Sequence, residues 1–136
     1  MNKILSEIKK NIVKDVLPKY KFIKDYTIER SFKPRADYLG WYRHNSVFNN
    51  GKPIIRLNIP IIIEESKKLN TISLYDIVLT TILHELGHSI QQYNGGMGYY
   101  DEKEAEDFAY FYWDFGEVLD LNNKEPKKNN KNVLAL

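Results

Sequence analysis

The stretch TTILHELGHSIQQYNGG, from Thr80 to Gly96, repeats apolar residues at helical spacing and ends at a pair of glycines. This spacing predicts an amphipathic helix with a single buried stripe. The stripe is expected to consist of Leu79, Leu83, Leu86 and Ile90. Ser73 to Asp76 resembles a capping box that opens the helix, and the segment 94–96 is typical of a helix end. The sequence therefore predicts one long helix in the middle of the chain.

The segment HELGH, His84 to His88, lies within this helix and matches the pattern H-E-x-x-H. Histidines four positions apart share a helical face, so His84 and His88 can offer nitrogen atoms to a single ion. Glu85 lies about 100° round the helix, where it can reach a water held by that ion and act as general base. Chance would produce the pattern in roughly one chain of this size in a few hundred. The motif therefore favours a metal site over an ordinary solvated helix face.

Gly87 stands inside the motif, in the middle of the predicted helix. A glycine at such a position destabilises a helix by about 1 kcal/mol relative to alanine. Close approach by a second backbone or by a ligand is a common reason for a glycine there. We therefore expect another backbone or a ligand to lie close to this part of the helix.

A catalytic zinc site usually has three protein ligands and one open position, so a third ligand is needed. The remaining histidine, His44, lies upstream in a predicted strand, and no histidine follows His88. This excludes the H-E-x-x-H-x-x-G-x-x-H arrangement of metzincins. A downstream carboxylate is the natural replacement, and the chain supplies Asp101, Glu102, Glu104, Glu106 and Asp107.

Helix geometry narrows the choice of the third ligand to Glu102 or Glu104. The two side chains point about 200° apart, so only one of them can face the histidines. The side of Glu104 carries aromatic residues that suggest a packed face, Phe111 and Phe115. The side of Glu102 carries small residues that would let the two helices approach closely, Ala105 and Ala109. We predict Glu102 as the ligand and retain Glu104 as the alternative.

Other side chains are candidates for supporting roles at the same site. Glu106, one turn beyond Glu102, can accept a hydrogen bond from a ligating imidazole and hold its orientation. A further donor is needed to stabilise a tetrahedral oxyanion in peptide hydrolysis. The candidates for that donor are Tyr93, Tyr99, Tyr100 and His44.

The rest of the chain predicts an α+β fold with a short antiparallel sheet. An N-terminal amphipathic helix ending near Pro18 is expected to bury Ile4, Leu5, Ile8, Ile12, Val13, Val16 and Leu17. Aromatic and β-branched residues from Tyr20 to Ile63 predict strands, with an Asn-Gly turn before the last of them. Pro53 and Pro60 flank that last strand and place it at a sheet edge. A final helix is expected from about Asp101 to Leu119.

Composition indicates one intracellular domain. The chain has 136 residues, 43% of them hydrophobic and 28% charged, which suits a single domain over residues 1–120. Residues 121–136 form a polar tail that is expected to be disordered. A net charge of +2 gives no strong case for nucleic-acid binding. Without cysteine, signal peptide or a long apolar run, we expect a soluble, cytoplasmic protein that does not enter a membrane.

Two motifs resemble the ImmA/IrrE-type zinc metallopeptidases: HELGH, and EKEAEDFA at Glu102 to Ala109, which is similar to the family's E-x-E-A-N-x-F-A. IIRLN at Ile54 to Asn58 looks like the strand that these proteins place before the active-site helix. The resemblance runs from about Lys52 to Gly116, although Glu106 stands where the family usually has asparagine, and only 13 residues separate the second histidine from the carboxylate.

The resemblance implies a small zincin-like domain in which the short antiparallel sheet packs against the active-site helix and a second, ligand-bearing helix. It further implies that His84, His88 and Glu102 bind Zn²⁺ and that Glu85 is the base. The substrate would be a protein or peptide, such as a transcriptional repressor, that lies extended along Ile54 to Ile59. A metal-stabilised protein-binding module without proteolytic activity remains the alternative, and Glu85 argues against it because a structural site has no use for a base.

Overall fold

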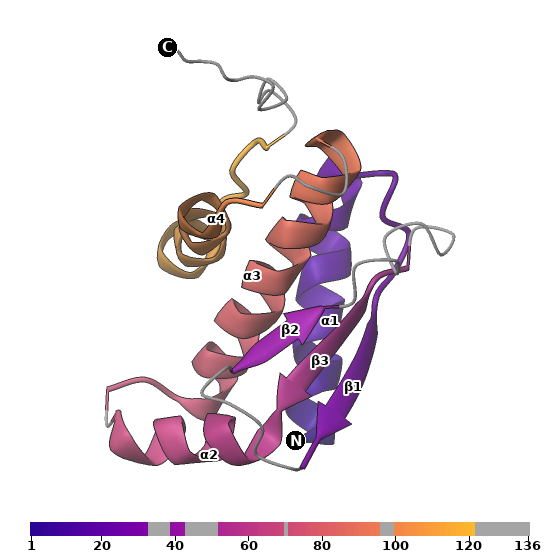
Figure 1. The fold of residues 1–136 in the computed structure, drawn as a ribbon. Helices are drawn as coiled ribbons and strands as arrows, with labels where there is room; N and C mark the ends of the chain where they lie inside the picture. Colours follow the sequence, from indigo (N-terminus) through magenta and orange to yellow (C-terminus); the bar gives the residue numbers. More distant parts are fainter. Residues whose placement is uncertain (33–38, 43–51, 70, 96–99, 122–136) are drawn as a thin grey trace.

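The computed structural model describes residues 1–32, 39–42, 52–69, 71–95 and 100–121 (Figure 1). Its elements confirm the predicted α+β class. In chain order they are α1 (Asn2–Asp15), the 3₁₀ turn η1 (Leu17–Lys19), β1 (Thr27–Ser31), β2 (Gly40–Tyr42), β3 (Ile54–Asn58), α2 (Ile59–Lys68), α3 (Leu74–Gly95) and α4 (Glu102–Phe115). The Asn-Gly turn predicted before β3 lies outside the described residues.

The sheet is mixed, so the prediction of an antiparallel sheet is wrong for one of its two pairings. The strand order is β1-β3-β2, with β1 parallel to β3 and β2 antiparallel to it. The predicted edge strand, β3, is therefore the central one. Pro53 and Pro60 permit this because both lie outside the strand: the carbonyl of Pro53 accepts the Thr27 N–H at 3.0 Å, and Pro60 is in the first turn of α2.

The apolar run that follows β3 forms a helix and not the continued strand that its β-branched residues predict. Pro60 has the fixed φ that suits the first turn of a helix, and Lys67 and Lys68 lie in the last turn, where positive charge is favourable. Ile59 and Ile62, three positions apart, are the buried residues of α2. Tertiary burial of that one face outweighs the local strand preference.

The N-terminal helix packs one face on α3, as its spacing predicts (Figure 1). Of the predicted stripe, the fully buried members are Ile8, Ile12 and Val16, with Leu17 nearly so. Ile4 and Leu5 are only partly buried, and the prediction is wrong for Val13, because 46% of it is exposed. Tyr20 follows the helix and is also fully buried; its hydroxyl donates to the Leu119 carbonyl and accepts the Leu121 N–H at 2.8 Å.

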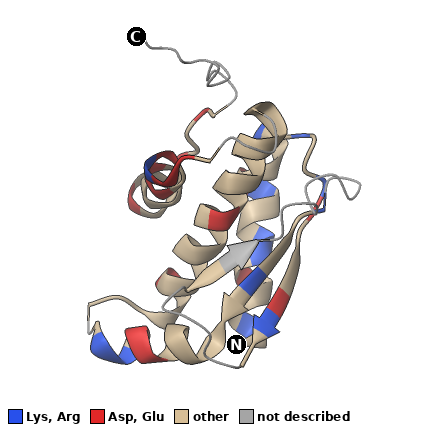
Figure 2. Ribbon diagram, in the orientation of Figure 1, with Lys and Arg blue, Asp and Glu red and all other residues tan. Residues whose placement is uncertain are grey.

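The end of the described chain is therefore tied to the core. Leu121, the first residue assigned to the polar tail, is 3% exposed and belongs to the domain, while residues 122–136 lie outside the described part. Lysines are prominent on α1 and acidic side chains on α4 (Figure 2). Within the described residues, even the 22-residue α3 lacks the continuous apolar character that a bilayer crossing requires.

Candidate metal centre

The long helix α3 begins and packs as the sequence predicts. The Asp76 N–H donates to the Ser73 hydroxyl at 3.1 Å, which confirms the predicted cap. All members of the predicted stripe are buried: Leu79, Leu83, Leu86 and Ile90. Burial of this stripe fixes the rotation of α3 about its axis, and with it the direction in which the HELGH side chains point.

Gly87 lies at a tight contact between α3 and α4, which confirms the expected close approach of another backbone. A Cβ atom built on Gly87 would lie 3.4 Å from the Ala105 Cα and 3.3 Å from the Phe108 Cδ2. Ala105 and Ala109 are both buried at this contact. The small residues on both helices allow α4 to lie close enough for Glu102 to reach the histidines.

Replacing Gly87 with leucine is expected to destabilise the fold by about 1–3 kcal/mol, because the added side chain must push α4 away. Urea unfolding of the purified variants would measure the difference in free energy of unfolding. Glu64→Leu, on the exposed side of α2, introduces the same side chain without such a contact and should cost less than about 0.5 kcal/mol. Equal stability of the two variants would contradict the tight contact.

Three hydrogen-bond acceptor atoms converge between α3 and the start of α4. The His84 Nε2 lies 3.2 Å from the His88 Nε2 and 2.8 Å from the Glu102 Oε1. The Glu102 Oε1 lies 3.4 Å from the His88 Nε2. These are the residues whose ligand atoms form a possible metal-binding group among the described residues.

The Nδ1 atoms of both imidazoles point away from the place where the two Nε2 atoms and the Glu102 Oε1 converge. The His84 Nδ1 lies 2.8 Å from the Glu106 Oε1, a carboxylate oxygen that can only accept, so this nitrogen donates. The His88 Nδ1 lies 2.8 Å from the Gln91 Oε1 and likewise donates. In the neutral imidazoles, both Nε2 atoms therefore present lone pairs to the space beside Glu102. Glu106 thus makes the orienting contact that the sequence predicts.

This arrangement fits a zinc ion. Two imidazole nitrogens and one carboxylate oxygen are a donor set of catalytic zinc sites. Ligand atoms bound at about 2.0–2.1 Å in tetrahedral geometry lie about 3.3 Å from one another, close to the separations found here. A cation between the three acceptors also relieves their mutual repulsion.

The protonation states favour metal binding as well. Burial lowers the pKa of His88, whose side chain is fully buried, so the imidazole is neutral at neutral pH. Partial burial favours a higher pKa for Glu102, but the hydrogen bond from Tyr100 and the nearby imidazoles of His84 and His88 outweigh it and leave that pKa below its usual value. The carboxyl group is therefore ionised, and a metal ion would displace no proton from either side chain.

Glu85 is buried on α3, with 8% of its surface exposed. Burial, together with the negative charge of Glu102, raises the pKa of Glu85 to about 8 when no cation is bound. The carboxyl group thus lies near enough to Glu102 to sense its charge. A cation at the three acceptor atoms would favour the ionised form, which is the form that a general base requires.

The raised pKa of Glu85 predicts a pH-dependent stability in the presence of chelator. The folded state binds the Glu85 carboxyl proton more tightly than the unfolded state does. The contribution of Glu85 to the free energy of unfolding is therefore complete below about pH 4.5 and is lost as the pH rises through about 8. Thermal unfolding in chelator should therefore show the Tm of Glu85→Gln rising relative to that of the parent protein from pH 5 to pH 9. The relative rise should be roughly 4 °C for each kcal/mol of stability that the parent loses. Glu64→Gln should follow the parent throughout. A constant difference for Glu85→Gln would rule out the shift.

Glu104, the alternative ligand, points elsewhere. Its side chain is buried, and its Oε1 accepts from the Gln91 Nε2 at 2.9 Å. The packed aromatic face expected on this side is wrong for Phe115, which is 66% exposed. Glu104 therefore lies within the contact between α3 and α4, while Glu102 converges with the histidines.

The described oxyanion candidates differ in their surroundings. The Tyr100 ring stacks on His88 with centroids 3.9 Å apart, and its hydroxyl donates to the Glu102 Oε2 at 2.9 Å. Tyr93 stacks on Phe22 instead, also at 3.9 Å. Tyr99 and His44 lie outside the described residues. Tyr100 is thus the described candidate that contacts two of the convergent side chains.

Gln91 is the site residue that sequence reasoning missed. It lies one helical turn after His88 and accepts that residue's Nδ1–H. The signal for it was present, because side chains at positions i and i+3 of a helix are neighbours. The H-E-x-x-H pattern ends at its second histidine and therefore does not include this partner.

The predicted substrate strand needs correction, because β3 is paired on both sides and cannot accept another strand. Within the described chain, β2 also packs against α3. A Cβ atom built on Gly40 would lie 2.7 Å from the Thr81 Cγ2, so β2 passes over α3 one turn before His84. Its side opposite β3 has no strand partner among the described residues.

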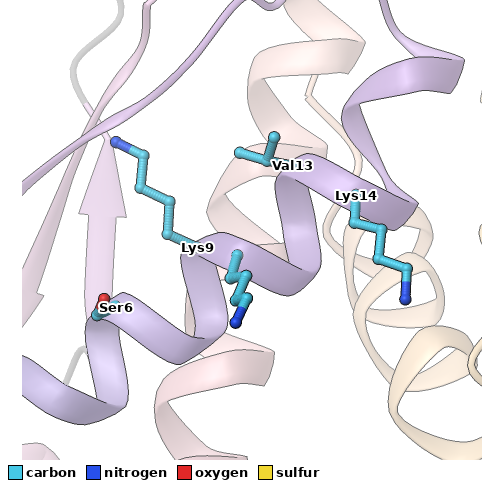
Figure 3. Close-up of a pocket in the computed structure, with 5 residues that line it drawn as sticks. Ser6, Lys9, Val13 and Lys14 are labelled. Carbon is cyan, nitrogen blue, oxygen red and sulfur yellow. The ribbon is translucent and has the colours of Figure 1, made fainter.

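The hollow of about 440 Å³ on α1 is a different feature (Figure 3). It is lined by Ser6, Lys9, Lys10, Val13 and Lys14. These residues offer neither imidazole nor carboxylate, and the Lys9 Nζ forms an ion pair with the Asp25 Oδ1 at 2.8 Å.

The chain matches no protein-family model, and comparisons with curated proteins and with solved structures found no significant similarity. Its function is therefore argued from its own residues.

Proposed function

We propose that this chain is a small zinc metallopeptidase of the ImmA/IrrE kind, with a zincin-like domain. The observation that carries the proposal is the convergence of three acceptor atoms, the His84 Nε2, the His88 Nε2 and the Glu102 Oε1. In its neutral form, each imidazole donates its hydrogen to a separate partner on the far side of its ring. Such a set has little purpose without a cation.

Glu85 distinguishes a catalytic centre from a structural one. Bound zinc would supply an electrophile that polarises the peptide carbonyl and acidifies a water molecule. The Glu85 carboxylate would take the proton of the attacking water and pass it to the leaving amine. Tyr100, whose hydroxyl lies at Glu102, is the described side chain best suited to donate to the oxyanion. A purely structural zinc site would not need a buried carboxyl group beside its ligands.

The substrate in this proposal is an extended segment of a regulatory protein, such as a transcriptional repressor, in the cytoplasm. The identity of the target rests on the family resemblance alone. The mode of binding rests on β2, whose outer side pairs with no strand in the described part of the chain and would take up a strand through main-chain hydrogen bonds. A peptide bound there would run across α3 close to His84.

The test is metal content followed by cleavage. Protein purified without chelator should contain about one zinc per chain, and His84→Ala should contain none. The zinc-loaded protein should cleave an unstructured peptide library, with products identified by mass spectrometry, and a chelator should stop the cleavage. Failure to take up zinc would end the proposal. Zinc that is needed for folding, with no cleavage in any library, would instead support the metal-stabilised binding module.

A further inference from the structure

The Gln91 side chain is 1% exposed and satisfies all four of its hydrogen-bonding positions. Its Oε1 accepts from the His88 Nδ1 at 2.8 Å and from the Asp101 N–H at 3.2 Å. Its Nε2 donates to the Asp101 carbonyl at 2.8 Å and to the Glu104 Oε1 at 2.9 Å. The amide therefore has one orientation, since turning it over would place donors against donors.

This orientation determines which nitrogen of His88 carries the hydrogen. Because the Gln91 Oε1 can only accept, the neutral imidazole must hold its hydrogen on Nδ1 and leave the Nε2 lone pair toward His84 and Glu102. The stacked ring of Tyr100 covers one face of the same imidazole. His88 is thus held both in its tautomer and in its plane.

The same amide also positions the start of α4. It binds both the N–H and the carbonyl of Asp101, in the manner of a neighbouring strand. Asp101 is the N-cap of α4, because its carboxylate accepts the Glu104 N–H at 3.1 Å. Glu102 is the next residue, so its backbone is fixed by a side chain of α3.

We propose that Gln91 is a positioning residue that sets two zinc ligands at once, His88 directly and Glu102 through Asp101, with Glu104 as its anchor. The inference rests on the proposed zinc site. It also accounts for the acidic side chain at Glu104, which holds the Gln91 amide group in its single orientation. Glutamine is required at position 91, because glutamate would place a second carboxylate against Glu104, and leucine would leave the His88 hydrogen without an acceptor.

The test compares four variants by zinc affinity, measured in competition with a chelating dye. Gln91→Leu should bind zinc about 10–100-fold more weakly than the parent protein. Glu104→Gln removes the charged acceptor of the Gln91 amide but keeps a neutral one, so its loss of zinc affinity should be smaller than that of Gln91→Leu. Gln91→Glu should lose affinity, because the new carboxylate would face both the Glu104 carboxylate and the Asp101 carbonyl. The double variant Gln91→Glu with Glu104→Gln should regain only part of it, because the hydrogen bond to position 104 re-forms with donor and acceptor exchanged while the Asp101 carbonyl stays without a donor.

A second readout is independent of zinc and of activity. In metal-free protein, the ¹⁵N NMR shifts of His88 should report the Nδ1–H tautomer in the parent and a mixture of tautomers in Gln91→Leu. Unchanged zinc affinity in Gln91→Leu, or a double variant that binds zinc no more tightly than Gln91→Glu, would overturn the proposal. If the parent protein bound no zinc while the tautomer still depended on Gln91, the proposed function would fail and the positioning of His88 would stand.

Discussion

Replacing Glu85 with glutamine is expected to lower the rate of peptide hydrolysis by about 10²–10⁴-fold, the usual contribution of a general base. The amide has nearly the same size as the carboxylate but cannot take a proton from water. Glu85 is not among the convergent acceptor atoms, so zinc content should remain near one ion per chain. The variant would thus separate catalysis from metal binding.

The measurement is the rate of product formation on a cleaved peptide, with zinc determined on the same samples. Glu64→Gln makes the same chemical change on the exposed side of α2 and should retain the full rate. Full activity in Glu85→Gln would remove the general-base role. Loss of both zinc and activity would instead mean that Glu85 helps to hold the ion.

The second large effect is expected for Glu102→Gln, which should weaken zinc binding by more than the roughly 10–100-fold typical of a partner outside the ligand set. The substitution removes the negative charge and the ionised oxygen that lies 2.8 Å from the His84 Nε2. The hydroxyl of Tyr100 would also lose its charged acceptor. Chelator competition, carried out as for Gln91, gives the dissociation constants.

The matched control is Glu104→Gln, an identical change two positions along α4. Because Glu104 is buried in the contact between the helices and acts only through Gln91, its amide variant should lose much less zinc affinity than Glu102→Gln. The reverse result, a large loss only in Glu104→Gln, would make Glu104 the third ligand. Circular dichroism on both variants would check that α4 is retained.

The parts of the site that the sequence predicts well are those governed by local helix geometry. His84 and His88 share a face because they are four residues apart, and Ser73 caps the helix because its hydroxyl is three residues from the N–H it accepts. Gly87 indicates a close neighbour because glycine is costly in a helix. The prediction that Glu102 faces the histidines also depends on this geometry, because small residues on its side of α4 indicate the face that approaches α3.

The parts that the sequence does not predict depend on contacts between distant segments. Nothing local to Ile54–Asn58 indicates that β3 lies between β1 and β2, since pairing depends on strands that come much earlier in the chain. The helix at Ile59–Lys68 is missed because its isoleucines favour strands in isolation. Gln91 is missed for a related reason, because its role depends on Asp101 and Glu104, which belong to another element.

The burial of the convergent side chains is uneven, since the His88 side chain has no exposed surface while that of Glu102 is 63% exposed. Exposed side chains change rotamer within picoseconds to nanoseconds, whereas a buried ring on a packed helix can move only with its surroundings. An ion held here would therefore enter and leave on the side of Glu102. Exchange of the metal would then require the rotation of one surface carboxylate and no unfolding of the domain.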